Sequence, residues 1–408
     1  MTVFIGTLLA AYALGVVSLF WHIRQTSRLV GQDASIPIPA TIAADLPAID
    51  VVVPVKDEEH NIAMCLEALL REDYPRARIL VVNDRSTDGT AAAVQTIQNE
   101  HPQVKRVDIT HLPAGAFGKP NAIETITPML TGDIVFFIDS DIQVKPGCLA
   151  AVVGFMRANS LDWFAAYGEP SLTYFWERLL VPLFGAIAYS WYDPRKISDP
   201  NWPDAIGSGF MVARREAYLA IGGHGAVKDQ YDEDSAMLRR AKKAGQTLSF
   251  VISPNLYVVK LYGNLARTIR GFNRTLIGGL KTIPRFLITV HALLFVSLLP
   301  YLLLIAIPLL MAAGVAVPFA NWWLAVAGLH LVLSNILIWQ IYRTAQLPLR
   351  TSLLHPIGSA AAIWICARAA GDLWRGKPIT WRGTSYTGTV AGAAPADGLA
   401  NPPVRTGP

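Results

Sequence analysis

The segment that decides the fold reads Gly132-Asp133-Ile134-Val135-Phe136-Phe137-Ile138-Asp139-Ser140-Asp141. It is a run of apolar residues with high β propensity, and it ends in two carboxylates separated by one residue. In an α/β sheet, such a strand carries its C-terminal end to the rim where ligands bind. Asp139 and Asp141 are therefore placed to hold a hard divalent cation, Mg²⁺ or Mn²⁺, which takes carboxylate and phosphate oxygens. A solvated strand end is the alternative, because the Asp-x-Asp pattern is common. A nucleotide diphosphate is the first ligand to consider.

The composition is too apolar for an ordinary soluble protein. Of the 408 residues, 52% are hydrophobic and only 16% are charged, which indicates a membrane protein with a soluble portion. The formal net charge of +5 is small and the basic residues are scattered. This pattern argues against nucleic acid as a partner and favours a membrane surface. The three cysteines form no metal-binding pattern and are expected to be buried thiols.

The N-terminal region predicts a membrane anchor. Residues 3–21 are continuously uncharged and long enough, at about 20 residues, to cross a bilayer as a helix. Arg24 and Arg28 follow this stretch. The positive-inside rule then puts the N-terminus outside and the next segment in the cytoplasm.

Two further apolar regions lie near the C-terminus. Residues 286–342 contain no Asp, Glu, Lys or Arg, which predicts two membrane-spanning helices with a turn near residues 314–321. A shorter apolar run at 353–370 either crosses the membrane or dips into it and returns. Arg343 and Arg350 put the loop before this run on the cytoplasmic side.

The region between these membrane segments alternates strand and helix patterns. A buried strand at 49–55, an amphipathic helix at 61–71 and a strand at 78–82 form a βαβ unit, which implies parallel pairing. Capping residues at 87–90 open the next helix, and residues 100–110 contain a third short strand before the Asp-Ser-Asp strand. Four strands in α/β alternation predict a Rossmann-like sheet.

The donor-side motifs follow the ends of these strands. Asp57 and Glu58 come after the first strand and Asp84 after the second, where carboxylates can accept hydrogen bonds from ribose hydroxyls or a base imide. The alternative for Asp84 is that it caps a turn. With the segment Gly118-Lys119-Pro120-Asn121-Ala122 and the Asp-Ser-Asp strand, these stretches resemble family 2 glycosyltransferases with a GT-A fold. The resemblance covers about residues 49–280. It implies donor-nucleotide contacts for the following residues: Asp57, Glu58, Asp84, Lys119 and Asp139.

The acceptor-side motifs come later in the chain. Gly207-Ser208-Gly209-Phe210 is similar to the family's acceptor-side loop, in which small residues let a substrate approach the backbone. Tyr231-Asp232-Glu233-Asp234 matches the family's Glu-Asp motif at the start of a helix. The resemblance makes Asp234 the general base, with Glu233 and Gly209 near the acceptor or diphosphate; burial, Glu233 and Asp232 are expected to raise the pKa of Asp234. The alternative is a set of acidic residues favoured by the first turn of a helix.

The last family motif, Gln-x-x-Arg-Trp, is altered in this chain. The nearest match is Gly271-Phe272-Asn273-Arg274-Thr275, so only the arginine remains. Arg274 can still pair with phosphate through its planar donors. The missing tryptophan weakens a processive function, because membrane polysaccharide synthases of this family use it to hold the growing chain.

The layout of one anchor, a cytoplasmic domain and a few C-terminal spans is similar to that of glycosyltransferases that act on ceramide, hopanoid or carotenoid lipids. We therefore expect inverting, metal-dependent transfer of one sugar from a nucleotide-diphosphate sugar, with UDP as the expected carrier, to a hydroxyl of a membrane lipid. The alternatives are a processive polysaccharide synthase and a catalytically silent nucleotide-sugar-binding membrane protein. The expected location is the inner (cell) membrane of bacterial type, with the catalytic domain cytoplasmic.

The expected domains are a transmembrane anchor, a linker, a GT-A domain, an interfacial helix with about three C-terminal transmembrane helices, and a largely disordered polar tail. Their boundaries are 1–24, 25–48, 49–280, 281–372 and 373–408, in that order.

Overall fold

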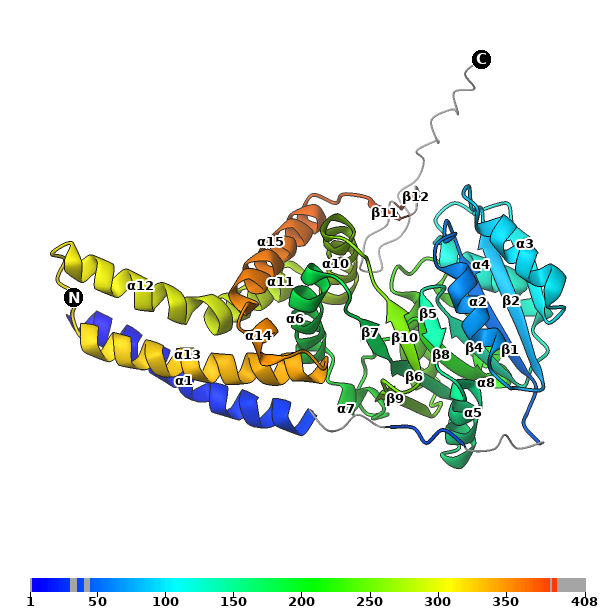
Figure 1. Cartoon of the computed structure of the whole chain (residues 1–408), viewed down its shortest axis with the longest axis horizontal. Coiled ribbons are helices and arrows are strands. Elements are labelled where there is room, and N and C mark those ends of the chain that lie inside the picture. The colour runs from blue at the N-terminus through cyan, green and yellow to red at the C-terminus, as the bar shows by residue number, and fades with distance from the viewer. Residues whose placement is uncertain (1, 30–34, 40–44, 382–383, 387–408) are drawn as a thin grey trace, which may run out of the picture.

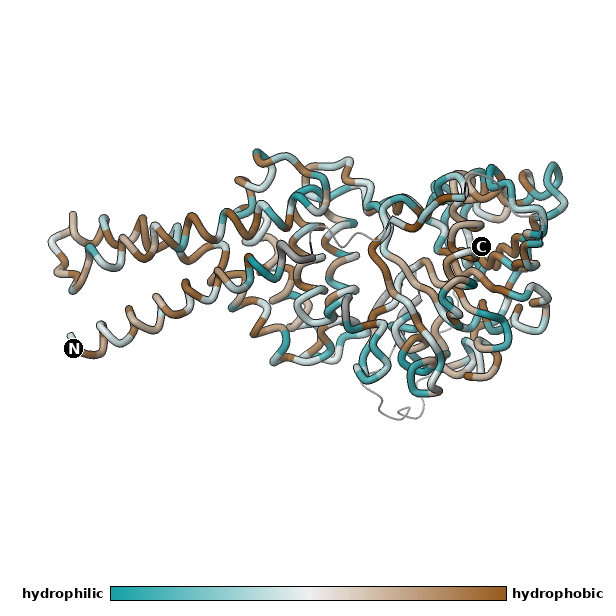
Figure 2. The backbone as a smooth tube through the Cα atoms, turned by 90° about the horizontal axis from the view of Figure 1, so that it is seen from below, coloured by the Kyte–Doolittle hydropathy of each residue, from teal (hydrophilic) through white to brown (hydrophobic). Residues whose placement is uncertain are grey.

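The structure of this protein is a computed structural model that describes residues 2–29, 35–39, 45–381 and 384–386. Figure 1 shows a sheet domain at one end, long helices at the other end and a group of shorter helices between them. Figure 2 shows that the long helices are largely apolar along their length. The sheet and the apolar helices therefore occupy opposite ends of the molecule.

The main sheet has seven strands in the order β3-β2-β1-β4-β8-β6-β9. The strands β1 to β4 are parallel, whereas β8 lies antiparallel between β4 and β6, and β9 pairs in parallel with β6. The α/β alternation predicted for the first four strands is confirmed. The strands are β1 (Ile49–Val55), β2 (Ala77–Asp84), β3 (Val104–Ile109), β4 (Ile134–Ile138), β6 (Trp163–Tyr167), β8 (Phe210–Arg214) and β9 (Leu248–Ile252).

The helices α2, α3 and α4 connect the first four strands, and two further helices complete the cover of the sheet. Alternate residues of each strand face opposite sides: Val51 and Phe136 pack with α2 and α5, whereas Val52 and Phe137 pack with α4 and α9. All five residues of β4 are buried, as expected for a central parallel strand covered on both faces. The helices are α2 (Ile62–Leu70), α3 (Thr90–Glu100), α4 (Gly118–Ile126), α5 (Cys148–Ala158) and α9 (Glu233–Lys243).

A second, smaller sheet was not predicted from the sequence. Its three strands have the order β5-β10-β7 and comprise Ile142–Val144, Tyr257–Lys260 and Glu169–Ser171. The backbone N–H of Lys260 donates to the carbonyl of Asp141 at 2.8 Å. This sheet therefore fixes the segment that follows the end of β4.

Four helices form a layer between the sheet domain and the long helices (Figure 1). They are α6 (Phe175–Trp191), α10 (Leu265–Leu280), α11 (Ile283–Leu293) and α15 (His355–Trp374). They share one apolar core, in which the rings of Phe184 and Phe272 stack with centroids 3.9 Å apart.

The described residues contain three helices that are long and apolar enough to cross a membrane: Thr2–Gln25 within α1 (Thr2–Leu29), Ile283–Ala312, and α13 (Ala320–Thr344). The second comprises α11, one π-helical turn and α12 (Leu299–Ala312) in succession. The N-terminal span and the two spans with a turn between them agree with the prediction.

The expectation of about three C-terminal spans is corrected to two candidates. The run 353–370 lies mostly in α15, which is long enough to cross a membrane but is less apolar than the three candidate spans. Its buried residues pack on α6, α10 and α11. The composition of this run resembled that of a span because burial against protein selects the same apolar residues as burial in lipid.

The predicted polar tail begins with an ordered part. Ile379–Trp381 and Thr384–Tyr386 pair as the antiparallel strands β11 and β12. The expectation of disorder concerned the tail from Gly388, which lies outside the described residues.

Candidate active site

The centre of the candidate site is the ammonium group of Lys119. Its Nζ lies 2.9 Å from Asp139 Oδ1, 2.8 Å from Glu233 Oε1 and 3.2 Å from Asp234 Oδ1. The side chain of Lys119 is 18% exposed and that of Asp234 is 21% exposed. The structure thus brings together a donor-side lysine, a candidate metal ligand and the candidate base.

Three separate elements deliver these groups. Lys119 lies in the first turn of α4, Asp139 follows β4 directly, and Glu233 and Asp234 begin α9. The backbone N–H of Asp139 donates to the carbonyl of Gly209 at 2.8 Å, which joins the end of β4 to the loop before β8. Because β8 and α9 come late in the chain, the site depends on long-range packing rather than on one local motif.

The electrostatics of Asp234 reflect this crowding. Burial raises the pKa of the Asp234 carboxyl well above its usual range, the charges of Glu233 and Asp139 raise it further, and the Lys119 ammonium opposes the shift. The sequence analysis also expected Asp232 to raise this pKa, and that contribution stays a prediction. Asp232 is paired with Arg239 and Lys281, which balance its charge.

Asp141 shares the negative field of the site. Burial raises the pKa of its carboxyl to about 7, with further increases from Asp139 and Glu58 and a decrease from Lys119. Glu58 in turn accepts a hydrogen bond from Asn61 Nδ2 at 2.8 Å. Asp139 and Glu58 therefore lie close enough to Asp141 to disfavour the ionised form of the Asp141 carboxyl.

Two glycines make room for the acidic side chains. A Cβ atom on Gly209 would lie 2.8 Å from Asp139 Cγ, and one on Gly207 would lie 2.7 Å from the backbone nitrogen of Ser235, beside Asp234. Both separations are too short for real side chains. The structure shows that Gly209 makes room for the Asp139 carboxylate and that Gly207 makes room for the first turn of α9. The role of these glycines in substrate approach stays a prediction.

The predicted nucleoside-binding residues lie at the ends of β1 and β2, which are paired strands. Asp57 Oδ1 accepts hydrogen bonds from the backbone and the hydroxyl of Thr87 at 2.7 and 3.3 Å. Lys56 Nζ donates to the carbonyls of Asp84 and Arg85, both at 3.3 Å. These contacts hold the two loops together at one edge of the sheet.

Arg85 is a residue of this edge that the sequence analysis did not single out. Its guanidinium forms a two-point ion pair with Asp84, at 2.7 and 2.9 Å. Its backbone φ is 55°, in the left-handed region that favours glycine. A bulky residue within the turn-forming stretch from Asp84 to Gly89 was the available signal.

Arg274 lies in α10, away from the cluster around Lys119 in sequence but near its neighbours in space. Burial raises the pKa of Tyr231, and the charge of Arg274 lowers it, so the two side chains are close. The ring of Tyr231 packs edge-on against Phe117 at 5.7 Å, and Phe117 directly precedes α4. Arg274 therefore lies on the side of the site that faces the layer of α6, α10, α11 and α15.

No group of three or more His, Cys, Asp or Glu side chains in the described part of the chain is arranged to hold a metal ion. Asp139 and Asp141 remain as a pair, and Mg²⁺ is commonly held by one or two carboxylates together with substrate phosphates and water. Burial is the main cause of the raised pKa of Asp141, and the charges of Asp139 and Glu58 add to it; a bound cation would offset those charges. This donor set is therefore compatible with a divalent cation whose other ligands come from a diphosphate.

Comparison with known proteins points in one direction. Residues 50–222 match the sequence profile of Glycosyl transferase family 2, which covers the donor-side motifs and Gly209 but ends before Asp234. The β-monoglucosyldiacylglycerol synthase of Synechocystis is 28% identical over 201 residues, which are 48% of this chain and 39% of that protein. Glycosyltransferase AglE of Haloferax volcanii is 28% identical over 123 residues, or 30% of this chain and 39% of that protein. These alignments span about two fifths of the relatives' length.

A solved structure extends the likeness to most of the chain. The mannosyltransferase PcManGT from Pyrobaculum calidifontis, solved with GDP-Man and Mn²⁺, is 20% identical. The match covers 90% of this chain and 99% of that chain with a TM-score of 0.50, which supports a shared fold. Taken with the strand order and the residues at the strand ends, these matches show that residues 50–222 form a family 2 glycosyltransferase domain with a GT-A fold.

Proposed function

We propose that this protein transfers a single sugar from a nucleoside-diphosphate sugar to a hydroxyl of a membrane lipid, with inversion at the anomeric carbon. The observation that carries the proposal is the shared contact of Lys119 with Asp139 and Asp234. The Lys119 ammonium thus lies between the candidate donor-side carboxylate of Asp139 and the candidate base Asp234. A reaction that joins two substrates needs both groups within reach of the same bond.

The donor is expected to lie along the edge formed by β1, β2 and β4. Asp57, Glu58 and Asp84 would contact the nucleoside, with UDP as the expected carrier. Asp139 and Asp141 would hold Mg²⁺ or Mn²⁺ against the diphosphate. When bound, the cation would stabilise the negative charge of the departing diphosphate.

Asp234 is the proposed general base. It would take the proton of the acceptor hydroxyl while the acceptor oxygen bonds to the anomeric carbon and the bond from that carbon to the diphosphate oxygen breaks. The raised pKa of Asp234 suits a group that must accept a proton near neutral pH. A single displacement of this kind inverts the anomeric carbon. Glu233, Gly209 and Arg274 would line the acceptor and diphosphate side.

A lipid acceptor is supported by the membrane-facing part of the chain. Three helices of the described residues are apolar and long enough to cross a membrane, and one relative is named as a β-monoglucosyldiacylglycerol synthase. Arg24 and Arg343 lie near the C-terminal ends of α1 and α13, and Arg350 lies in α14 (Leu349–Ser352). These parts of the helices point toward the sheet domain (Figure 1), which supports a cytoplasmic catalytic domain in an inner (cell) membrane.

The test is transfer by membranes that contain the wild-type chain. They are incubated with a panel of nucleotide sugars, Mg²⁺ or Mn²⁺ and total lipid extract, and new glycolipids are identified by mass spectrometry. Asp234→Asn should lower transfer by about 10²-fold or more, as expected for a lost general base. Asp229→Asn removes a nearby exposed carboxylate and is the matched control.

The outcomes separate the alternatives. A metal-dependent adduct of one sugar, absent in Asp234→Asn, supports the proposal. A ladder of longer products would indicate a processive polysaccharide synthase. Nucleotide binding without turnover of any donor would indicate a silent binding protein.

A further inference from the structure

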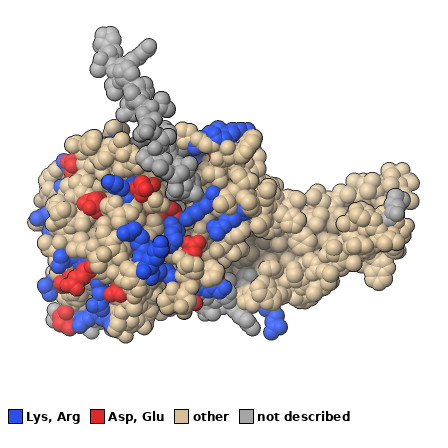
Figure 3. All heavy atoms as spheres, turned by 180° about the vertical axis from the view of Figure 1, so that it is seen from behind, with Lys and Arg blue, Asp and Glu red and all other residues tan. Residues whose placement is uncertain are grey.

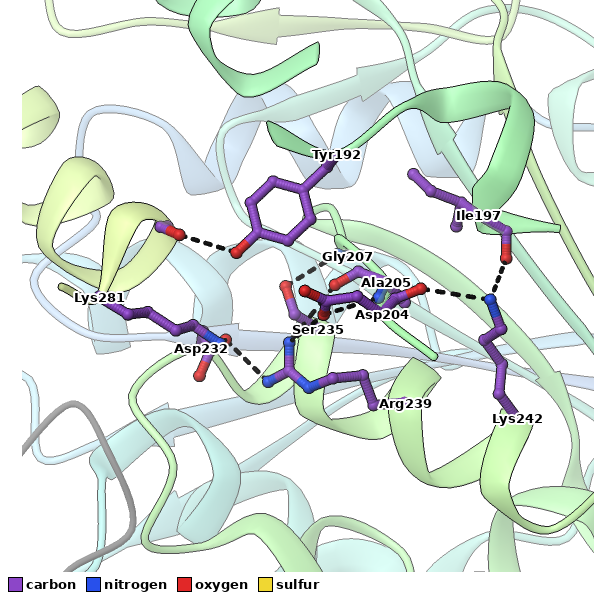
Figure 4. A network of polar contacts seen from close by, with 11 residues as sticks. Tyr192, Ile197, Asp204, Ala205, Gly207, Asp232, Ser235, Arg239, Lys242 and Lys281 are labelled. Atoms are coloured by element: carbon purple, nitrogen blue, oxygen red, sulfur yellow. Dashed lines mark hydrogen bonds and ion pairs between the residues drawn. The ribbon is translucent and has the colours of Figure 1, made fainter. Parts of the chain in front are cut away.

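A polar network runs along one face of α9 (Figure 4). Ser235, Arg239 and Lys242 are spaced by four and three residues, so their side chains share one face of this helix. Asp232, at the N-cap of the same helix, joins the network by pairing with Arg239 Nη2 at 2.8 Å. The helix that begins with Glu233 and Asp234 is thus held by contacts separate from those of Lys119.

One side of the network holds the segment that leads into the acceptor-side loop. Arg239 Nη1 pairs with Asp204 at 3.5 Å, and Lys242 Nζ donates to the carbonyl of Asp204 at 3.2 Å. Ser235 Oγ accepts the backbone N–H of Gly207 at 3.0 Å. These contacts hold the segment from Asp204 to Gly207, which leads to Gly209, against α9.

The other side of the network reaches the membrane-facing helices through Lys281. Its Nζ pairs with Asp232 Oδ2 at 2.9 Å, and both side chains are about one fifth exposed, at 23% and 20%. Lys281 caps the C-terminus of α10, and the candidate span beginning at Ile283 follows after one residue. Figure 4 shows the lysine extending from the end of its helix toward Asp232.

The backbone of Lys281 makes the choice of this residue informative. Its φ is 62°, a left-handed helix cap at which glycine is the usual residue. A lysine at this position bears conformational strain that glycine would avoid. Strain that persists at an ordered position indicates a use for the side chain, and the contact with Asp232 supplies one.

We infer that Lys281 is a positioning residue for the acceptor step: through Asp232 it fixes the start of α9, and with it Asp234, relative to the helices that enter the membrane. The inference rests on the proposed function, because it assumes that a lipid hydroxyl approaches from that side. Asp232 is two residues from Asp234 at the start of α9, whereas the predicted donor residues Asp57 and Asp84 lie at the ends of β1 and β2. Loss of the contact should therefore impair transfer to lipid more than binding of the donor.

The experiment compares Lys281→Gly with Lys281→Arg in the full chain. Glycine removes the ion pair but relieves the left-handed backbone, so we expect a melting temperature equal to or above that of the wild type. We expect kcat for lipid glycosylation to fall about tenfold or more. The donor KM, and the Kd for UDP with Mn²⁺, should stay within about twofold of wild type, since uniform binding is untouched.

Lys281→Arg keeps the charge and should retain most of the kcat that Lys281→Gly loses. Lys243→Met, at an exposed position of α9, is the control for a removed lysine. Asp232→Asn removes the charge that pairs with both Lys281 and Arg239, so it should lower kcat at least as much as Lys281→Gly does. Adding Lys281→Gly to Asp232→Asn should cost little more, because the contact of Lys281 is already lost.

The results distinguish this inference from the proposed function. If Lys281→Gly keeps wild-type kcat, or loses stability and donor binding in parallel with kcat, the positioning role is overturned while lipid glycosylation by the wild type still stands. If the wild type glycosylates no lipid with any donor, the proposed function fails first and the inference fails with it.

Discussion

Replacement of Lys119 by methionine tests how far the acidic cluster depends on one ammonium group. Each of its three contacts, at 2.8 to 3.2 Å, corresponds to about 5–6 kcal/mol of Coulomb attraction at an effective dielectric constant of about 20. Desolvation and repulsion among the carboxylates offset most of this. Removal of one partner from a buried pair costs about 3–5 kcal/mol, and we expect this destabilisation for metal-free Lys119→Met at a pH of about 8.

The destabilisation should depend on pH in a specified direction. The pKa of Asp234 is already raised in the wild type, and loss of the ammonium must raise it further. The variant's folded state then holds a proton that its unfolded state releases. Where the variant keeps this proton and the wild type has released it, the variant's stability relative to the wild type should fall as the pH rises, by about 1.4 kcal/mol per pH unit.

Thermal unfolding in one detergent, followed by intrinsic fluorescence at pH values of about 6 and 8, measures both effects. A loss of about 3–5 kcal/mol corresponds to a fall in Tm of about 6–10 °C. Lys243→Met, at an exposed position, is the control. A loss below about 1 kcal/mol, the range of surface ion pairs, would refute the view that Lys119 is the main counter-charge of the cluster. A loss that is equal at both pH values would refute the protonation argument.

Three further predictions concern the same edge of the sheet. Gly209→Ala must displace the Asp139 side chain, so we expect a destabilisation of about 1–3 kcal/mol and weaker activation by Mn²⁺, measured by unfolding and by metal titration of transfer. Arg85→Gly should be more stable than Arg85→Ala by about 1 kcal/mol, because only alanine is strained at a φ of 55°; equal melting temperatures would contradict this.

Asp141→Asn should stabilise the metal-free protein at high pH. The pKa of the Asp141 carboxyl is raised from 3.8 to about 7 in the folded state, so the wild type loses folding stability as the pH rises between these values. The free energy of unfolding of Asp141→Asn should exceed that of the wild type by near zero at a pH of about 4 and by at most about 4 kcal/mol at a pH of about 8. A difference that stays constant across unfolding curves in this pH range would contradict the prediction.

The sequence predicted the first half of the sheet well, for a physical reason. Strands β1 and β2 are mostly apolar and β4 is entirely apolar, because both faces of the sheet are covered. Parallel strands bring their C-terminal ends to one edge. The positions of Asp57, Asp84 and Asp139 at that edge followed from this rule. The roles of these residues in binding stay predictions.

The contacts that join the site could not be predicted in the same way. Lys119 and Asp234 are 115 positions apart, and no local pattern shows that the lysine bridges three carboxylates. The antiparallel insertion of β8 between β4 and β6, which brings Gly209 against Asp139, is also a property of the tertiary fold. The turn-forming stretch around Arg85 marked a turn, but the residue type did not show that Arg85 itself takes the left-handed backbone.

The first helix of the chain has a consequence for assembly. The hydroxyl of Tyr12 in α1 contacts Nδ1 of His330 in α13 at 2.8 Å in a buried setting, across 318 positions of sequence. At about 5–20 residues per second, a ribosome needs about 15–60 s to make the intervening chain. During that interval α1 has no access to its partner, so the native helix pair can form only after nearly the whole enzyme has been synthesised. A chaperone or lipid contact that shields Tyr12 over this time would govern the yield of folded protein.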